Sequence, residues 1–135
     1  ALRQHNQWTL VQMMSFTDAN CFRYRLICST LSGRPVRFDS IRDGTSEPGL
    51  LEEEVAFLRL LECLSSGCAV EINQTGTSHF SLKVSLVASG TRCLYKPGLI
   101  IGGTVQQSFK IKRNISYFLE PLLLLGLFGK KVKTN

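Results

Sequence analysis

The segment from residue 50 to residue 66 limits the possible folds of this chain most strongly, because a helical pattern there is followed at once by a strand pattern. The apolar positions of the helical pattern are Leu51, Val55, Leu58, Leu61 and Leu64. They would line one face of a helix, and Glu52–Glu54 would place negative charge at its N-terminus, where the helix dipole is positive. Gly67 would end this helix, and residues 68–73 alternate in polarity as a half-buried strand does. The chain therefore combines helices with a sheet.

The same two periodicities assign most of the remaining chain. The further predicted helices are 20–32, with Asn20 as N-cap and Gly33 as the stop, and 113–127; the further strands are 36–41, 80–86 and 94–96. Pro121 lies in the last helix and lacks an amide hydrogen, so we expect it to kink that helix or to end an early turn. With a strand before the first helix, the order is strand, helix, strand, helix, then strands and a last helix. This order predicts an α/β (α+β) fold of two layers, with helices packed against a mixed sheet.

Length and composition exclude several classes of protein. A chain of 135 residues suits one domain and is short for two. The longest apolar stretch, 117–128, falls short of the roughly 18–20 residues that cross a bilayer, so no membrane partner is expected. Five cysteines and two histidines show no zinc-ligand spacing, so we expect no metal and no cofactor. The odd number of cysteines favours a reducing compartment.

The net charge of +6 favours a polyanionic partner such as nucleic acid. The residues that could contact RNA phosphates are Arg23, Arg25, Arg34, Arg37 and Arg42, and then Lys112 and Arg113 in a second basic set with Lys110, Lys130, Lys131 and Lys133. The alternative is a solvated face, on which these side chains pair with carboxylates such as Asp39 and Asp43. No aromatic residues are interleaved with them as in an RNA-recognition surface, so direct base recognition is not predicted.

Other candidate sites have weaker signals. Ser78 and His79 are adjacent, but no third residue completes a catalytic triad. Gly98, with Gly102 and Gly103, could cradle a phosphate, although a Pro-Gly turn more often marks a bend or the close approach of two strands. No catalytic residue is therefore predicted.

Five blocks of sequence occur in an order that is typical of one known family. They are Phe22–Leu26 with Ser29–Val36, Ile41-Arg42 with Pro48–Leu50, Glu71–Thr77, Lys96–Gly103 and Ser116–Leu123. Together they cover most of residues 16–130 and resemble the RNA 3′-terminal phosphate cyclase superfamily, more closely its cyclase-like branch of ribosome biogenesis.

The resemblance implies a fold of repeated βαβαββ units. Residues 15–103 would form the first unit, residues 104–135 would open a second, truncated unit, and residues 1–14 would be an unmatched extension. Residues 78–92 are extra relative to the cyclase-like branch, which has a tight hairpin at this point. They would be an elaborated hairpin, or the product of a retained intron or alternative splicing.

The resemblance also implies which chemistry the catalytic members perform. In them ATP adenylylates a histidine near the family's C-terminus, outside this chain, and the AMP passes to an RNA 3′-phosphate that closes to a 2′,3′-cyclic phosphate. They carry a Glu-Gly-Gly-Gly-Gln run where this chain has Phe16–Asn20, whose side chains would obstruct the approach of phosphate to the backbone. Arg23 and Arg42 fall on arginine positions of the cyclases, whereas Thr45 replaces an arginine and Glu53 a glutamine. We therefore expect a degraded nucleotide site and no enzymatic activity.

The function that the resemblance implies is non-enzymatic scaffolding in pre-rRNA processing and small-subunit assembly, in the nucleolus. The implied partners are a ribosome-biogenesis GTPase, pre-rRNA and the U3 small nucleolar ribonucleoprotein particle. Two alternatives stay open. One is a fragment of an active ATP-dependent RNA 3′-terminal phosphate cyclase, and the other is a splice-variant product without independent function.

Overall fold

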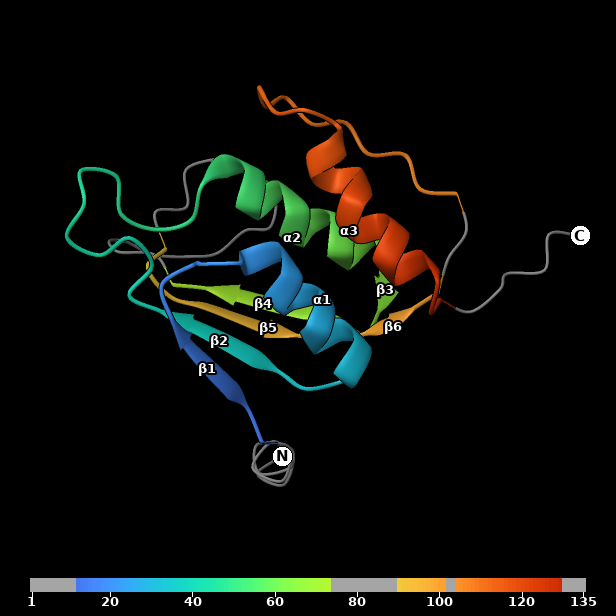
Figure 1. Cartoon of the computed structure of the whole chain (residues 1–135), viewed down its shortest axis with the longest axis horizontal. Coiled ribbons are helices and arrows are strands. Elements are labelled where there is room, and N and C mark those ends of the chain that lie inside the picture. Colours follow the sequence, from blue (N-terminus) through green and yellow to red (C-terminus); the bar gives the residue numbers. More distant parts are fainter. Residues whose placement is uncertain (1–11, 74–89, 102–103, 130–135) are drawn as a thin grey trace, which may run out of the picture.

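The computed structural model describes residues 12–73, 90–101 and 104–129. Its elements, in chain order, are β1 (Met14–Thr17), α1 (Phe22–Ser32), β2 (Val36–Asp39), α2 (Glu52–Leu64), β3 (Ser65–Ser66), β4 (Ala69–Ile72), β5 (Cys93–Lys96), β6 (Leu99–Ile100) and α3 (Ser116–Gly126). Apart from the two-residue strands β3 and β6, this is a βαβαββ unit followed by a helix, so the predicted α+β fold is confirmed. Figure 1 shows α1 and α2 over one face of the sheet, with α3 beside α1 and farther from the sheet.

The main sheet is mixed and has the strand order β1-β2-β5-β4. β1 and β2 are parallel, with Met14 opposite Val36 and Thr17 opposite Asp39. β5 is antiparallel to both of its neighbours, β2 and β4. Parallel neighbours need a crossover connection, and the chain makes it through α1 between β1 and β2. The turn after β1 and the turn after β2 therefore lie at the same end of the sheet.

The alternation of side chains along the strands decides which face of the sheet is buried. Val36 and Phe38 of β2 and Cys93 and Tyr95 of β5 are fully buried in the core. Phe38 packs against Phe22 of α1, with ring centroids 4.8 Å apart. On β2 the intervening positions 37 and 39 are charged and keep contact with solvent. The sheet is therefore covered on one face, as the two-layer prediction requires.

Helix α1 begins later than the sequence predicts. Asn20 is not the N-cap, because the helix starts at Phe22 and Cys21 before it is left-handed, with φ 53° and no side-chain hydrogen bond that caps the helix. Asp18, two residues before Asn20, instead accepts a hydrogen bond: its side-chain Oδ1 binds the backbone N–H of Ala19. The predicted stop is confirmed, since Gly33 follows the helix with φ 69°, which glycine adopts without steric cost.

Other elements are also shorter than predicted, among them β2 and α2. β2 ends at Asp39, because Ser40 takes a left-handed φ of 52°. α2 begins at Glu52 and ends at Leu64, and Ser65–Ser66 then pair antiparallel with β6. Gly98 marks a close approach of two segments rather than a phosphate cradle, since a Cβ there would lie 2.4 Å from the carbonyl oxygen of Ser66.

Pro121 does not end α3, which continues from Ser116 to Gly126. A proline cannot donate a hydrogen bond to the carbonyl four residues earlier, and in this helix that carbonyl belongs to Tyr117. Arg23 of α1 donates to the Tyr117 carbonyl oxygen instead, at 2.8 Å. The expected end of a turn at Pro121 is wrong, because a side chain from another helix replaces the missing N–H.

Several predicted features fall on residues outside the described ranges. These are residues 1–11 of the extension, the extra segment as far as residue 89 with its strand-like run 80–86, Gly102, Gly103 and the basic residues after 129. Among the described residues, no helix combines the length and the apolar character that a membrane crossing requires.

Truncation of Phe38 tests the position of the core. Phe38→Ala removes a fully buried ring and should lower the free energy of unfolding by about 3–5 kcal/mol, since burial is lost and a cavity remains. Phe128→Ala removes the same atoms from a side chain that is 71% exposed and should cost less than about 0.5 kcal/mol. Urea unfolding followed by circular dichroism measures both, and equal losses would contradict the assigned core.

Candidate functional site at the ends of the parallel strands

Open sheets that contain parallel strands bind ligands most often at the carboxyl ends of those strands. Here these ends are Thr17 of β1 and Asp39 of β2. In the turns just beyond them, four described residues other than glycine take left-handed φ values: Asp18, Cys21, Ser40 and Arg42. Such conformations persist only where surrounding contacts hold them. These two turns form the candidate site.

Asp18 links the two turns through one oxygen atom. Its Oδ1 accepts the backbone N–H of Ala19 at 2.8 Å and the backbone N–H of Arg42 at 3.2 Å. These hydrogen bonds hold the pKa of Asp18 below its ordinary value, and the bond from Ala19 contributes most. Converging backbone N–H groups are a common way to bind an anion, and here a carboxylate of the chain itself takes that place.

The side chain of Arg42 is also bound internally. Its Nη1 lies 2.9 Å from Oε2 of Glu54, and its Nη2 lies 2.6 Å from Oε1, which makes a bidentate pair. Glu54 is only 5% exposed, and its Oε2 also accepts the backbone N–H of Leu51 at 2.9 Å at the start of α2. The hydrogen bonds with Glu54 are the main cause that raises the pKa of Arg42.

Together these contacts lock the turn after β1, the turn after β2 and the start of α2. The backbone N–H groups of Ala19 and Arg42 and the Arg42 guanidinium, three groups that could bind a phosphate, already have carboxylate partners. Within the described ranges, no group of three His, Cys, Asp or Glu side chains is placed to hold a metal ion. These contacts hold the two turns and the start of α2 together.

Arg23 and Arg113, both predicted to contact RNA, come together around the ring of Tyr117. Their guanidinium carbons lie 4.2 and 4.9 Å from the ring centroid. Arg23 also pairs with Glu120 at 3.9 Å, and Arg113 pairs with Glu53 of α2 at 3.7 Å. Burial raises the pKa of Tyr117 to about 12. The two arginines therefore hold α3 to the rest of the fold.

Arg37 and Arg25 contact different parts of the fold. Arg37 pairs with Asp39 at 2.8 Å, as the alternative of a solvated, paired face predicts, and Arg92 contacts the same carboxylate at 2.6 Å. The guanidinium of Arg25 lies 4.0 Å from the ring centroid of Phe16. Its Nη1 is buried and has no hydrogen-bond partner among the described residues.

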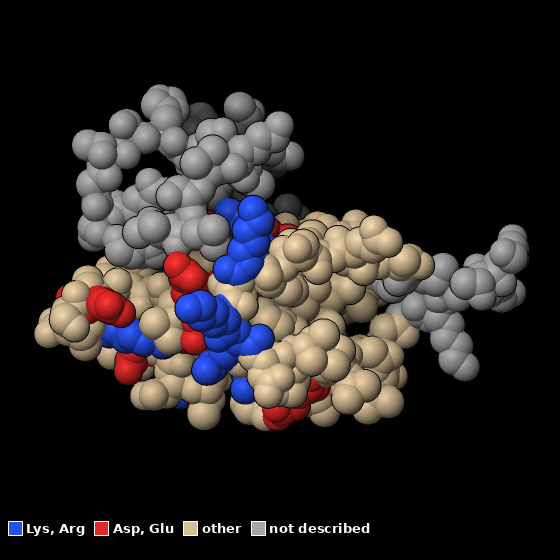
Figure 2. Space-filling model, turned by 90° about the horizontal axis from the view of Figure 1, so that it is seen from above, with Lys and Arg blue, Asp and Glu red and all other residues tan. Residues whose placement is uncertain are grey.

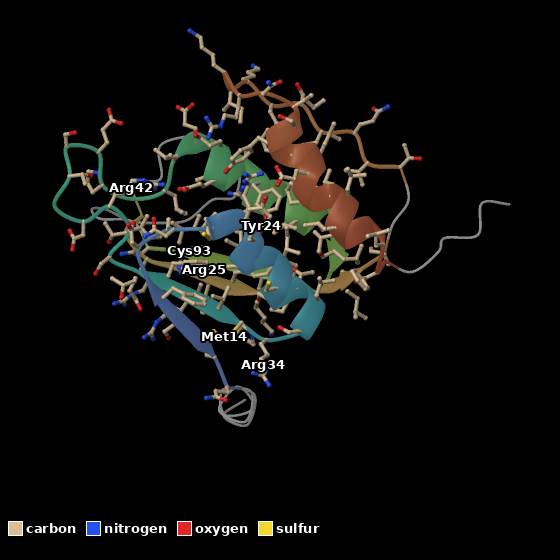
Figure 3. All side chains as sticks on the ribbon, viewed as in Figure 1. Met14, Tyr24, Arg25, Arg34, Arg42 and Cys93 are labelled. Atoms are coloured by element: carbon tan, nitrogen blue, oxygen red, sulfur yellow. The ribbon has the colours of Figure 1, made fainter. Side chains whose placement is uncertain are left out.

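Arg34 and Lys112 are exposed and form no ion pair with any described residue. Arg34 follows α1 and lies at the opposite end of the sheet from Arg42 (Figure 3). Lys112 lies in the segment that leads into α3. The seven predicted residues do not gather at one site.

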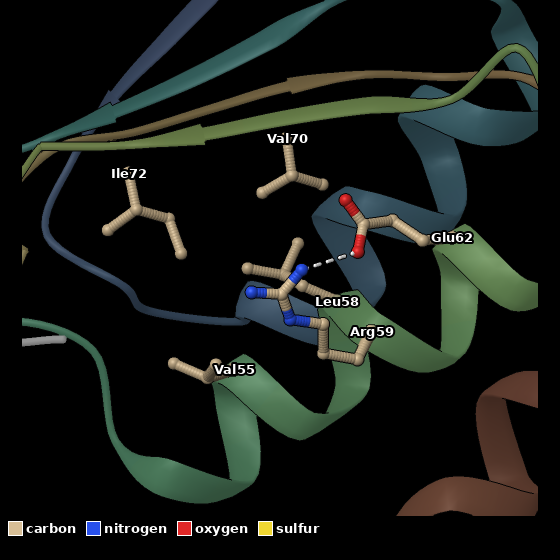
Figure 4. Close-up of a pocket in the computed structure, with 6 residues that line it drawn as sticks. All are labelled: Val55, Leu58, Arg59, Glu62, Val70 and Ile72. Carbon is tan, nitrogen blue, oxygen red and sulfur yellow. Dashed lines mark hydrogen bonds and ion pairs between the residues drawn. The ribbon is translucent and has the colours of Figure 1, made fainter. Parts of the chain in front are cut away.

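A shallow pocket lies elsewhere, between α2 and the edge strand β4 (Figure 4). Val55 and Leu58 of α2 and Val70 and Ile72 of β4 form its apolar wall. The ion pair between Arg59 and Glu62, at 3.0 Å, completes its lining. Its residues are separate from those of the candidate site.

The family model described as RNA 3′-terminal phosphate cyclase matches residues 14–134 of this chain. The chain belongs to this family. It is 45% identical over 123 residues to the probable RNA 3′-terminal phosphate cyclase-like protein of Arabidopsis thaliana, and 40% identical over 122 residues to the RNA 3′-terminal phosphate cyclase-like protein of Homo sapiens. It is 37% identical over 117 residues to the rRNA processing protein RCL1 of Saccharomyces cerevisiae.

These alignments cover most of this chain but a small part of each relative. They include 90% of the chain for the Arabidopsis and human relatives and 87% for the yeast relative. The same alignments include only 29%, 29% and 28% of the relatives. The chain therefore spans less than a third of the length of these family members.

Family membership gives the turn after β1 a comparison. At the position where the resemblance implies the glycine run of the cyclases, this chain has the end of β1, the left-handed Asp18 and then Ala19. Sequence reasoning predicted obstruction by side chains at these positions and missed the carboxylate that accepts the N–H groups. It also treated Glu54 only as part of a charged helix start. Its spacing of three residues from Leu51 was a usable signal, because a Glu at that position often accepts the N–H at the helix start.

Glu54→Gln tests the pair that joins the turn after β2 to α2. The variant should lower the free energy of unfolding by about 2–3 kcal/mol, since it leaves a mostly buried guanidinium without its charge partner. The control is Glu62→Gln on the same helix, because Glu62 pairs with Arg59 at 3.0 Å and both side chains are more exposed. That control should cost about 0–1 kcal/mol. Urea denaturation compares the two, and equal effects would show that Arg42 and Glu54 have no special role.

The pH dependence of stability tests Asp18. Because its pKa is lowered by folding, the ionised carboxylate stabilises the fold above the unfolded-state pKa of about 3.9, and this contribution is lost as the pH falls through the lower folded-state pKa. The wild type should therefore exceed Asp18→Asn in stability at neutral pH, and the difference should shrink below about pH 4. Chemical denaturation across pH measures this difference.

Asp43→Asn removes a carboxylate with the same charge from an exposed position in the turn after β2. It controls for the change in net charge. A difference between wild type and Asp18→Asn that stays constant down to the lowest pH would contradict the role of the ionised Asp18.

Proposed function

We propose that this chain is part of a non-enzymatic ribosome-biogenesis factor that acts in pre-rRNA processing and small-subunit assembly. The observation that carries the proposal is the internal pairing at the candidate site, where Asp18 and Glu54 supply the anionic groups that a nucleotide phosphate would otherwise supply. The names of the relatives support this class, since the yeast relative is an rRNA processing protein and the plant and human relatives are cyclase-like proteins.

The proposal extends to the division of the chain. Residues 1–14 are an extension. Residues 15–103, with the extra segment at 78–92, form one repeat unit, and residues 104–135 open a second unit. The element order supports this division, because α3 follows a βαβαββ unit whose four main strands already form one sheet.

Three of the basic residues are the best candidates for RNA phosphate contact. Arg25, Arg34 and Lys112 form no ion pair with described residues, and Arg34 and Lys112 are exposed. Phosphate contact requires cations that are not already neutralised. The other four, Arg23, Arg37, Arg42 and Arg113, bind carboxylates of the chain and act mainly by holding the fold.

The proposed partners are a ribosome-biogenesis GTPase, pre-rRNA and the U3 small nucleolar ribonucleoprotein particle, in the nucleolus. The name of the yeast relative, an rRNA processing protein, and the net charge of +6 support RNA as a partner, and the GTPase and the U3 particle rest on the family resemblance alone. In this mechanism the faces of the unit hold a protein, and the unpaired cations contact nearby RNA.

Removal of the unpaired cations tests the RNA contact. Arg34→Gln combined with Lys112→Gln should weaken binding of a pre-rRNA fragment by about three- to tenfold, because two phosphate contacts are lost. The slope of log K against log salt should fall by about 1–2. Fluorescence anisotropy at a series of salt concentrations measures both quantities.

The control removes the same charge from paired residues. Arg59→Gln combined with Arg92→Gln breaks ion pairs with Glu62 and Asp39 and should weaken binding less. Equal weakening would show that net charge alone governs binding and would refute the assigned contacts. A covalent AMP adduct formed by the full-length protein with ATP would support the active cyclase as the alternative function.

A further inference from the structure

The turn after β2 contains the sequence Asp43-Gly44, the one place in the chain where an Asp or Asn directly precedes a Gly. In such a pair the backbone nitrogen of the glycine and the side-chain carbon Cγ of the aspartate can join in a five-membered ring. Two reacting groups that are held close together in one chain react far faster than separate molecules do, and glycine has no Cβ beside the attacking nitrogen. The pair is therefore a place where the backbone itself can be changed chemically.

Both reacting groups are without partners in the described part of the chain. Asp43 and Gly44 are exposed, and the carboxylate of Asp43 forms no ion pair or hydrogen bond with a described residue. The N–H of Gly44 likewise donates to no described residue, whereas the N–H groups on either side of it donate to Ser40 and Arg42. Gly44 has a left-handed φ of 79°, and a Cβ there would have no atom within 4 Å. Neither group has to give up a contact in order to react.

The loop that carries this pair lies away from the packed layers. Figure 1 shows it as the long connection between β2 and α2, which extends beyond the end of the sheet. Figure 2 shows Asp and Glu side chains at the surface of the same end of the molecule. Residues 43–48 are all exposed, and segments with few buried contacts change conformation at the lowest free-energy cost. The side chain of Asp43 is therefore free to turn toward the nitrogen of Gly44.

The other two aspartates of the chain provide a comparison. Asp18 accepts two backbone N–H groups, and Asp39 pairs with two arginines. The residues that follow them, Ala19 and Ser40, each have a Cβ beside the backbone nitrogen. Asp43 alone combines a following glycine with a carboxyl group that has no partner among the described residues.

We propose that Asp43 is a modification site, at which the backbone isomerises to isoaspartate without an enzyme. The nitrogen of Gly44 forms a bond with Cγ of Asp43, a C–O bond of the carboxyl group breaks, and the hydroxyl group and the amide proton leave as water. A water molecule then adds to one of the two ring carbonyls and opens the ring. Opening at the original backbone carbonyl leaves the chain running through Cβ and Cγ, with a free α-carboxylate. No atom is oxidised or reduced, and the mass of the chain is unchanged.

Isoaspartate would lengthen the turn that holds Arg42. The N–H and the hydroxyl group of Thr45 both donate to the carbonyl oxygen of Arg42, at 3.2 and 2.8 Å. Such a turn closes over a fixed number of backbone atoms, and isoaspartate adds one atom between donor and acceptor. Because Arg42 joins this turn to Asp18 and Glu54, the modification would loosen the candidate site itself. This inference goes beyond the rRNA role and stands independently of it.

Incubation of the purified 135-residue chain at physiological temperature and pH for several weeks tests the proposal. Two probes follow it: an isoaspartyl methyltransferase with radiolabelled S-adenosylmethionine methylates the α-carboxylate of isoaspartate, and the endoproteinase Asp-N cuts before aspartate but not before isoaspartate. Methyl label should accumulate with time, and the cut before Asp43 should be lost in step with it. The cuts before Asp18 and Asp39 should be lost at least about tenfold more slowly, because no glycine follows these aspartates.

The matched control is Asp43→Glu, which keeps the charge but would have to close a six-membered ring, and this ring forms far more slowly. The variant should take up at least about tenfold less methyl label than the wild type, because its reacting groups are no longer favourably placed. Equal labelling of the two proteins would overturn the proposal, since the isoaspartate would then come from another residue. Loss of all three cuts at one rate would overturn it as well, because the free state of Asp43 would then have no effect.

The unfolded wild-type chain separates the effect of the turn from that of the sequence. A sample kept in guanidinium chloride should lose the cut before Asp43 at a rate within about threefold of that of the folded sample, because the exposed loop leaves both groups free. A folded chain that keeps this cut while the unfolded chain loses it would overturn the proposal. The turn would then hold Gly44 away from the carboxyl group.

The isolated isoaspartyl form tests the effect on the turn. Its midpoint of urea unfolding should be lower than that of the unmodified chain by at least about 0.3 M, because the turn at Arg42 loses its hydrogen bonds. An equal midpoint would overturn the claim that the modification loosens the candidate site.

Discussion

The bidentate pair between Arg42 and Glu54 is the interaction on which the arrangement around the parallel strands depends. It lies where Glu54 is almost fully buried, so the electrostatic attraction is stronger than in water. Through this pair the turn after β2 is fixed to the start of α2. Through the backbone N–H of Arg42 and the carboxylate of Asp18, the same turn is fixed to the turn after β1. Three segments far apart in the sequence are thus held by two carboxylates.

This arrangement differs from that of a glycine-rich turn that binds phosphate. A glycine-rich turn offers bare backbone N–H groups to a phosphate, whereas here the N–H groups of Ala19 and of Arg42, one from each turn, donate to Asp18. An incoming phosphate would have to displace a carboxylate that is held by two hydrogen bonds, and it would also have to separate Arg42 from Glu54.

The sequence predicted the features that depend on local periodicity, and it missed those that depend on distant partners. The stripe from Leu51 to Leu64 predicted α2 because burial of that face needs no knowledge of what covers it. The two-residue strands β3 and β6 have no period to detect. Asn20 is a good N-cap by residue type, yet the turn is set by Asp18 and its contact with Arg42, 24 residues away. Pro121 stays within α3 because Arg23, also distant in sequence, replaces its hydrogen bond.

At the ends of β1 and β2, carboxylates of the chain itself are bound to the N–H groups of Ala19 and Arg42 and to the Arg42 guanidinium. Titration with ATP, followed by the NMR signals of the backbone amides of Ala19 and Arg42, tests it most directly. We expect that neither amide signal shifts while Asp18 is ionised. Saturable shifts of both amides in the wild-type chain would contradict it, because a nucleotide would then bind where Asp18 does.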